Sequence, residues 1–319
     1  MIQRLFFVLS FLFAVPCVRA ADLPGIPQFI DEMVSKHQFK RDELVQAFSR
    51  AERRQVIIDA ITTPATLKPW PEYRASFINA QRISGGLQFW QLYADALQHA
   101  EKQYGVPQEI IVALIGVETA YGRNAGKYST LDALTTLAFD YPRRADFFRG
   151  ELEQYLLLTR EQGLDLFKVQ GSYAGALGIP QFMPSSYRKY AVDFSGDGKT
   201  DLLHDPVDAI GSVANYFKQY GWLSGQPVTV RTGVSEDNCV GSLTEAHTVA
   251  EWVAGGMKPD KEIAADMSAR LIDFTVAGGK EFWLAFGNFD VITRYNNSDF
   301  YAMSVFQLAE ALREAHAQR

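Results

Sequence analysis

One apolar helix that carries a single inward carboxylate limits the fold of this chain more than any other segment. Residues 106–121, VPQEIIVALIGVETAY, follow helical periodicity, with Pro107 suited to the first turn and Gly122 to the stop. The inward stripe of this predicted helix consists of Ile111, Leu114, Ile115 and Glu118. The carboxylate therefore faces the interior, where the fold must either neutralise it or use it.

Two physical effects favour the protonated form of Glu118 near neutral pH. Burial penalises the ionised carboxylate, and the last helical turn adds the negative end of the macrodipole, so both effects are expected to raise the pKa of Glu118. A protonated carboxyl is what a general acid needs in order to protonate the leaving oxygen of a glycosidic bond. The structural alternative is a buried Glu118 neutralised by an arginine such as Arg123, just beyond the helix.

The first twenty residues, MIQRLFFVLSFLFAVPCVRA, are typical of a secretory signal peptide. Arg4 precedes an apolar run that is too short for a transmembrane anchor, and residues 18–20 offer a small-residue exit. Cys17 raises the alternative of an outer-membrane lipoprotein, but Pro16 stands where a small residue is expected before a lipidated cysteine. We therefore expect cleavage after Ala20 and a soluble periplasmic protein.

The amino-acid composition argues against some classes of binding partner and excludes a disulfide as a source of stability in the mature chain. The only cysteine besides Cys17 is Cys239, so the mature chain forms no intramolecular disulfide and depends on core burial, with or without a metal ion. The net charge is −6 and no basic block is present, which argues against nucleic acid and anionic membrane surfaces as partners. The 22 Phe, 14 Tyr and 5 Trp suit either an ordinary core or stacking on sugar rings.

Helical periodicity dominates most of the chain. Helices are predicted over 26–61 (several short ones), 72–104 (with Gly85-Gly86 as a weak point), 106–121, 130–162, 207–220 and 298–315 (with Ser298 as N-cap). In contrast, PVTVRTGV alternates with period two and predicts a strand. The sum is a mainly α (α+β) protein with a small inserted β-containing lobe, which we divide into residues 21–104, 105–223, 224–273 and 274–319.

The segment DFSGDGKTD follows the ligand spacing of a calcium-binding loop, with Gly198 at its sharp turn. The oxygen donors at alternate positions are Asp193, Ser195, Asp197, the carbonyl of Lys199, and Asp201. His204 stands where a bidentate Glu is expected, so Asp205 or Asp208 must close the site after a slightly longer loop. We expect a structural Ca²⁺; the alternative is an Asp-Gly turn without an ion.

Residues 169–184, VQGSYAGALGIPQFMP, contain too many Gly and Pro residues for a regular helix and predict a shaped loop. Ser172 and Gln181 in this loop suit hydrogen bonding to acetamido and hydroxyl groups of a sugar, and Tyr295 and Asn296 in the RYNNS turn are similar. Turn formation and capping explain each of the four equally well.

Four long stretches of the sequence resemble the B-type membrane-bound lytic murein transglycosylases and their soluble relatives. They are IIVALIGVETAYGRNAGKYSTLDALTTLAFDYPRRADFF, GSYAGALGIPQFMPSSYRKYAVDFSGDGKTDL, DPVDAIGSVANYFKQYGW and ITRYNNS. The resemblance covers nearly the whole mature chain and implies a lysozyme-like catalytic core over 105–223, with a helical lobe and a small β lobe around a glycan groove. By this match the calcium loop belongs to the family pattern, Glu118 is the catalytic acid/base, and the sugar subsites are lined by Ser172, Gln181, Tyr73, Tyr216 and Tyr295.

The resemblance also implies that one carboxylate acts twice on peptidoglycan glycan strands. Glu118 protonates the leaving oxygen of the MurNAc-GlcNAc bond and then removes the proton from O6 of the same muramic residue, which gives a 1,6-anhydro end. A two-carboxylate glycosidase would need a partner for Glu118, and capping or exposure adequately explains the available Asp132, Asp140, Asp146 and Glu151. We expect a monomer, with other cell-wall enzymes as candidate partners.

Two other functions stay open at this point. One is a lysozyme-type peptidoglycan hydrolase on the same core, and the other is a non-catalytic, calcium-dependent glycan-binding protein. The sequence does not distinguish endo from exo cleavage, and it does not define the preferred glycan length or peptide substitution.

Overall fold

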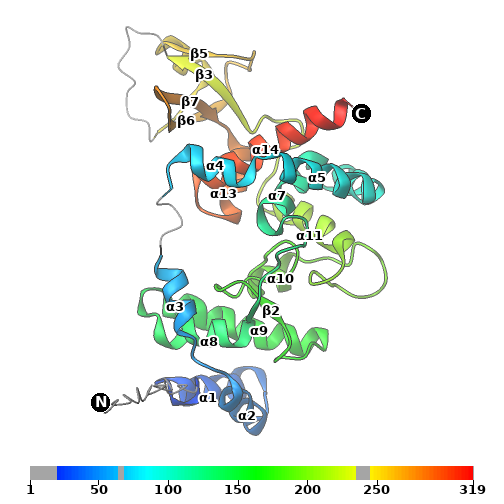
Figure 1. Cartoon of the computed structure of the whole chain (residues 1–319), viewed down its shortest axis with the longest axis vertical. Helices are drawn as coiled ribbons and strands as arrows, with labels where there is room; N and C mark the ends of the chain where they lie inside the picture. The colour runs from blue at the N-terminus through cyan, green and yellow to red at the C-terminus, as the bar shows by residue number, and fades with distance from the viewer. Residues whose placement is uncertain (1–19, 64–67, 235–244, 319) are drawn as a thin grey trace, which may run out of the picture.

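The computed structural model describes residues 20–63, 68–234 and 245–318 of the 319-residue chain. The molecule is elongated, with helices α1 (Ile26–His37) and α2 (Arg41–Arg50) at one end and an antiparallel sheet at the other (Figure 1). The predicted signal peptide, including Cys17, lies outside the described residues except for Ala20, which begins the short 3-10 helix η1 (Ala20–Asp22). Among the described residues, no helix is long and apolar enough to cross a membrane.

The N-terminal part of the chain is helical, as predicted. After α2 the helices are α3 (Gln55–Thr62), α4 (Trp70–Phe77), α5 (Ala80–Leu92) and α6 (Ala94–Tyr104). The helical stretch predicted over 72–104 is thus divided at two places. One is Asn79, whose side chain caps α5, and the other is Tyr93, which lies between α5 and α6.

The weak point predicted at Gly85-Gly86 is wrong, because both glycines lie inside α5. They are needed there for close packing: a Cβ on Gly86 would lie 2.5 Å from the Tyr121 hydroxyl and 2.5 Å from a methyl carbon of Leu312. Helix propensity disfavours glycine in such a position by about 1 kcal/mol. Here tertiary packing of an aromatic ring against the bare backbone overrides that preference.

Helix α7 (Gln108–Thr119) lies at the centre of the helical part and packs against α5, α6, α11 (Pro206–Gln219) and α14 (Asp299–Ala317) (Figure 1). Its residues from Ile110 to Val117 are all buried. The segment IIVALIGV is apolar all round rather than on one stripe, which is typical of a helix enclosed by others. The helices that follow α7 in the chain are α8 (Thr130–Asp140), η3 (Pro142–Arg144), α9 (Ala145–Gln162) and α10 (Pro184–Tyr190), of which α9 packs against both α8 and α10.

The inserted lobe contains a five-stranded antiparallel sheet with the strand order β4-β6-β7-β3-β5. Its elements are β3 (Thr229–Val234), β4 (Ala246–Thr248), α12 (Val249–Ala254), β5 (Met257–Pro259), β6 (Ser268–Val276) and β7 (Gly279–Ala285). The strand predicted from PVTVRTGV is β3. Because β6 and β7 form a hairpin, the sheet continues to Ala285 instead of ending at residue 273. The other domain limits stay predictions.

After the sheet, the chain returns to the helical core through α13 (Gly287–Tyr295) and α14. The predicted cap of α14 is confirmed, since the Ser298 side chain accepts a hydrogen bond from the Tyr301 backbone N–H. A second, two-stranded sheet pairs β1 (Tyr128–Ser129) with β2 (Gln170–Gly171). It holds the predicted Gly/Pro-rich loop next to the segment that follows α7.

Candidate active site

Glu118 lies in the last turn of α7, and the helix ends one residue later, at Thr119, with Ala120 as its C-cap. Ala120 adopts the left-handed conformation at φ 52°, and the Tyr121 N–H donates back to the carbonyl of Ile115 at 3.3 Å. This hydrogen-bond pattern usually has glycine at the left-handed position. The stop predicted at Gly122 therefore comes two residues earlier, at an alanine.

The ring of Tyr121 holds the backbone that follows Glu118. Tyr121 has φ 65°, which is rare for a bulky residue and requires support from its surroundings. Its ring lies against two bare backbone positions: a Cβ on Gly116 or Gly86 would be 2.7 or 2.5 Å from its hydroxyl oxygen. The hydroxyl donates to the carbonyl of Arg82 at 2.8 Å. The end of α7 is thus fastened to α5.

The Glu118 carboxylate is half-buried and accepts a hydrogen bond from the Tyr301 hydroxyl on α14. Burial raises the pKa of Glu118 to about 7, while the Tyr301 hydrogen bond acts in the opposite direction. No charged side chain of the described residues contributes to this shift. Arg123, the alternative partner considered from the sequence, has its guanidinium 5.8 Å from the centre of the Tyr121 ring. A carboxyl in this state can give and take a proton near neutral pH.

A group of tyrosines extends from Glu118. The rings of Tyr301 and Tyr295 are stacked, with 6.4 Å between centroids and 10° between planes, and Tyr295 meets Tyr216 edge-on at 4.8 Å. The Tyr295 hydroxyl donates to the carbonyl of Pro180 in the Gly/Pro-rich loop. Burial, with the negative charge of Glu118 second, holds the pKa of Tyr295 and Tyr301 well above the usual tyrosine range. Both phenols therefore remain protonated donors.

Tyr73 reaches the same region from α4. Burial raises the pKa of Tyr73 and the charge of Glu118 adds to the rise, which places the phenol within electrostatic range of the carboxylate. The Tyr73 ring packs against Phe300, with 5.5 Å between centroids, directly before Tyr301 in the chain. Tyr73, Tyr295 and Tyr301 are thus within electrostatic range of Glu118, and Tyr216 adjoins them through Tyr295.

The Gly/Pro-rich loop lies against the end of α7. The Thr119 hydroxyl donates to the carbonyl of Ile179 at 2.8 Å. The Gln181 side-chain amide donates to the carbonyls of Ala125 and Gly178, both at 2.9 Å, and its backbone is left-handed at φ 55°. Because the amide nitrogen is held, the side-chain oxygen of Gln181 has a fixed direction, and among the described residues no donor contacts that oxygen.

Ser172 has a structural role in the same loop. Its Oγ accepts hydrogen bonds from the backbone N–H groups of Ala174 at 3.2 Å and Ala176 at 3.0 Å, which is the turn role considered from the sequence. Its own hydroxyl proton is still available for donation to a ligand. Asn296 also serves a turn, since its carbonyl accepts the Ser298 N–H at 2.7 Å.

The acidic loop between α10 and α11 uses its carboxylates to accept backbone N–H groups. Asp193 accepts three such hydrogen bonds at 2.7–3.2 Å, Asp197 accepts one and Asp201 accepts two. Asp201 also contacts Nδ1 of His204 at 3.1 Å. Within the part of the chain that the structure describes, no group of three His, Cys, Asp or Glu side chains is arranged to hold a metal ion.

Asp208 and Asp205, the two residues predicted as candidates to close the calcium loop, have different hydrogen-bond partners in the structure. Asp208 is 1% exposed and its carboxylate accepts three backbone N–H groups of the loop at 2.8–2.9 Å. Asp205 instead caps α11 by accepting the Val207 N–H at 2.7 Å. The oxygen donors of this loop have the chemistry that Ca²⁺ prefers, and Asp208 is the acidic residue of α11 that faces them.

Comparison with known proteins identifies the family. Residues 23–310 match the family described as the transglycosylase SLT domain. The chain belongs to this family. This SLT-domain transglycosylase is 44% identical over 308 residues to the membrane-bound lytic murein transglycosylase B of Escherichia coli (strain K12), a match that covers 93% of this chain and 85% of that protein.

Solved structures of other transglycosylases have the same fold. The soluble lytic transglycosylase SltB1 of Pseudomonas aeruginosa superposes with a TM-score of 0.87 at 47% identity, covering 92% of this chain and 100% of that chain. The structure of Escherichia coli Slt35 in complex with calcium superposes with a TM-score of 0.87 at 45% identity, covering 93% of this chain and 95% of that chain. The structure of Pseudomonas aeruginosa SltB3 in complex with NAG-anhNAM-pentapeptide superposes with a TM-score of 0.82 at 28% identity, covering 90% of this chain and 78% of that chain. The predicted mainly α fold with a lysozyme-like core and a small β lobe is confirmed.

Sequence reasoning missed one residue of the candidate site, Tyr301. Its hydroxyl contacts Glu118 from a position 183 residues further along the chain. The available signal was a tyrosine within the amphipathic last helix, because a buried phenol usually has a hydrogen-bond partner. That signal predicts a hydrogen-bond acceptor for the Tyr301 hydroxyl, but it does not identify the accepting residue.

Proposed function

We propose that this SLT-domain transglycosylase cleaves the MurNAc-GlcNAc β-1,4 bond of peptidoglycan and leaves 1,6-anhydromuramic acid ends. The observation that carries the proposal is the state of Glu118, a half-buried carboxyl whose pKa is raised to about 7 and which contacts a phenol. Near neutral pH such a group is divided between its acid and base forms, so it can serve both halves of the reaction. The names of the relatives, and the anhydro-sugar ligand of SltB3, support this reaction class.

Glu118 acts first as an acid and then as a base. Its proton passes to the leaving glycan oxygen as the C1–O bond breaks, while the muramic N-acetyl group stabilises the oxocarbenium-like centre. The ionised Glu118 then takes the proton from the O6 hydroxyl of the same sugar, and O6 bonds to C1 to close the anhydro ring. Between these steps the Tyr301 hydroxyl stabilises the carboxylate by donating a hydrogen bond.

The pKa of Glu118 is not perturbed by any second carboxylate of the described residues, which favours this mechanism over a two-carboxylate hydrolase. Such a hydrolase places its second carboxyl within about 5–9.5 Å of the acid, yet no other carboxylate of the described residues perturbs the pKa of Glu118. The carboxylates considered from the sequence have other partners: Asp132 with Arg54, Asp140 with Arg53, Asp146 with Arg149, and Glu151 with Ser185.

The residues that hold the glycan strand are part of the proposal. Gln181 offers a side-chain oxygen of fixed direction for an acetamido N–H, and Ser172 retains a hydroxyl proton to donate. The tyrosines that complete the sugar-binding surface are Tyr73, Tyr216 and Tyr295. We expect the monomer to be the working form, and other cell-wall enzymes stay candidate partners.

A structural Ca²⁺ in the acidic loop is the second part of the proposal. The donor set is Asp193, Ser195, Asp197, the Lys199 carbonyl, Asp201 and Asp208. The carboxylates must turn from their present backbone N–H donors toward the ion, which would stabilise the fold by binding the native state alone. A chelator should therefore lower the melting temperature of wild type but not of Asp197→Ala. Identical melting curves with and without chelator would refute calcium binding.

The location is proposed from the sequence. Export by the first twenty residues, with cleavage after Ala20, would give a soluble periplasmic enzyme. N-terminal mass analysis of the mature protein should find Ala21 as the first residue. A diacylglycerol-modified Cys17 would instead make it an outer-membrane lipoprotein.

One digestion tests the reaction itself. Purified sacculi are treated with wild type and with Glu118→Gln, and the ends of the released muropeptides are identified by mass. We expect anhydromuramic ends with wild type alone, and the distribution of product lengths separates endo from exo cleavage. Reducing muramic ends would show a lysozyme-type hydrolase, and no release at all would refute the proposed activity.

A further inference from the structure

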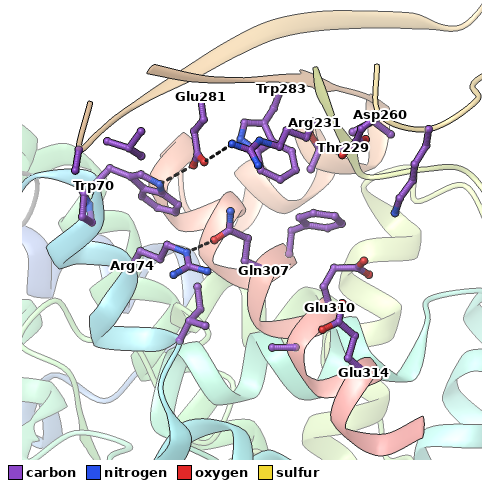
Figure 2. Close-up of a pocket in the computed structure, with 18 residues that line it drawn as sticks. Trp70, Arg74, Thr229, Arg231, Asp260, Glu281, Trp283, Gln307, Glu310 and Glu314 are labelled. Carbon is purple, nitrogen blue, oxygen red and sulfur yellow. Dashed lines mark hydrogen bonds and ion pairs between the residues drawn. The ribbon is translucent and has the colours of Figure 1, made fainter. Parts of the chain in front are cut away.

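A cavity of about 680 Å³ lies between α4, the C-terminal half of α14 and the strands of the β lobe (Figure 2). Its apolar wall is formed by Trp70 of α4, Trp283 of β7 and Phe306 of α14. Neither Glu118 nor any residue proposed to bind the scissile glycan lines it. The mechanism above therefore gives this cavity no role.

Charged side chains of both signs line the cavity. The basic ones are Arg74, Arg231 and Lys261, and the acidic ones are Asp260, Glu281, Glu310 and Glu314. Glu281 accepts a hydrogen bond from Trp70 Nε1 at 3.1 Å and lies 3.9 Å from Arg231, and Glu310 pairs with Arg313 at 2.7 Å. Within the described ranges, no ion pair involves Arg74, Lys261, Asp260 or Glu314. A lining of nearly balanced charge does not suit a polyanion or a simple cation, but it suits a ligand that itself carries both signs.

The spacing between the polar and charged side chains on α14 indicates how long a ligand must be to contact both ends of the cavity. Arg74 donates to the Gln307 side chain at one end of the cavity, and Glu310 and Glu314 follow further along the same helix (Figure 2). Glu314 is seven residues after Gln307, which is about 10 Å at 1.5 Å per residue. An extended peptide of about three residues spans that distance at roughly 3.3–3.6 Å per residue.

We propose that this cavity is an accessory site for a short zwitterionic peptide, with a carboxylate of the ligand at Arg74 and an ammonium group at Glu314. The peptide stem of peptidoglycan has this chemistry, so the inference rests on the proposed function and adds a second point of contact for the same substrate. Guanidinium suits a carboxylate because it presents paired N–H donors. The aromatic wall accommodates the aliphatic part of the peptide.

The cavity shares its two helices with the site around Glu118. The Trp70 ring lies 6.4 Å from Tyr73 and 5.2 Å from Phe300, measured between centroids, and Phe300 directly precedes Tyr301. A peptide that contacts Trp70 would therefore lie on side chains that pack directly against the tyrosines near Glu118. We expect this contact to strengthen the binding of peptide-bearing strands, and hence to lower KM, without taking part in proton transfer.

Calorimetric titration tests the site with three soluble probes: the free stem pentapeptide, NAG-anhNAM-pentapeptide, and NAG-anhNAM without peptide. Wild type is compared with Arg74→Gln and Glu314→Gln, and Arg143→Gln in η3 is the control, because Arg143 is exposed and does not line the cavity. We expect each cavity variant to weaken both peptide-bearing probes at least about tenfold and to leave NAG-anhNAM unchanged. Binding of the free pentapeptide shows that the peptide alone suffices, whereas an effect confined to NAG-anhNAM-pentapeptide shows that the site reads peptides attached to a strand.

Cleavage assays keep this inference separate from the proposed function. Glu314→Gln should raise KM for peptide-bearing strands while it cleaves strands stripped of peptide as wild type does. If wild type binds both peptide-bearing probes no better than NAG-anhNAM, or if Glu314→Gln and Arg74→Gln bind them as Arg143→Gln does, the accessory site is refuted while cleavage stands. Failure of wild type to cleave either kind of strand refutes the proposed function instead.

Discussion

Glu118 and Asp208 are carboxylates set into the same helical core, but the fold surrounds them with different donors. Asp208 is nearly inaccessible and accepts three backbone N–H groups, which compensate its negative charge. Glu118 retains some exposure yet accepts one phenolic hydrogen bond in apolar surroundings, and burial raises its pKa to about 7. The two carboxylates therefore differ in the number and kind of their donors: three backbone N–H groups of one loop hold Asp208, whereas a single phenol contacts Glu118.

The largest effect should come from Glu118→Gln. The amide keeps the shape of the side chain but has no proton to transfer, so we expect cleavage to fall by about a hundredfold to ten-thousandfold or more, because both steps use this group. The measurement is muropeptide release from sacculi at matched concentrations of folded protein. Glu151→Gln is a suitable control, since Glu151 is 6% exposed but binds Ser185 and not the proposed reaction centre. Equal activity of Glu118→Gln and wild type would remove Glu118 from the mechanism.

The same substitution should change how stability depends on pH. The folded state binds the Glu118 proton more tightly than the unfolded state, whose carboxyl has the ordinary pKa of 4.5 against about 7 in the fold. The resulting stabilisation is fully present below pH 4.5 and is lost as the pH rises through about 7, a loss of up to about 3 kcal/mol. Urea denaturation at pH 4.5, 6 and 8 should show this fall in wild type, relative to Glu118→Gln. Parallel curves for the two proteins would contradict the raised pKa.

Asp208→Asn tests the other carboxylate. An amide at this position loses charge and turns at least one of its own N–H donors toward backbone N–H groups, so we expect a loss of roughly 2 kcal/mol in unfolding free energy. Asp205→Asn is the matched control, because asparagine caps a helix as well as aspartate does. Denaturation is measured in chelator and in calcium, and activity per folded molecule should survive in both variants. Equal stability of the two variants would show that the loop does not depend on Asp208.

The smallest effect should come from Tyr301→Phe. Without the hydroxyl, the ionised form of Glu118 loses its donor and the pKa of Glu118 rises further. Because the acid must be protonated to act, the alkaline fall of the pH–rate profile should move to higher pH, with about a tenfold lower maximum rate, or about 1.4 kcal/mol. Tyr155→Phe is the control, since this buried hydroxyl donates to the Leu166 carbonyl outside the proposed site. An unmoved profile in Tyr301→Phe would show that this hydrogen bond does not tune the acid.

Local patterns were sufficient for most helices, for β3 and for the burial of Glu118, because helical periodicity and an inward carboxylate are both visible within one short segment. They were not sufficient for Tyr301, whose contact with Glu118 spans most of the chain. The same limit explains Gly85-Gly86, where local propensity suggests a break and a ring from another segment makes the glycines necessary. The β hairpin that extends the sheet to Ala285 likewise depends on pairing between strands, which single-strand alternation does not define.

The packing of Tyr121 has a consequence for how this sequence can vary. The ring occupies space that exists only because Gly85, Gly86 and Gly116 lack side chains, and a Cβ at any of the three would lie within 3.1 Å of it. Alanine at Gly86 or Gly116 is therefore compatible with the fold only if residue 121 also becomes smaller, and at Gly86 the Leu312 side chain must move as well. We expect Gly86, Gly116 and Tyr121 to change together or not at all among descendants of this chain, even though Gly86 comes from a separate stretch of sequence.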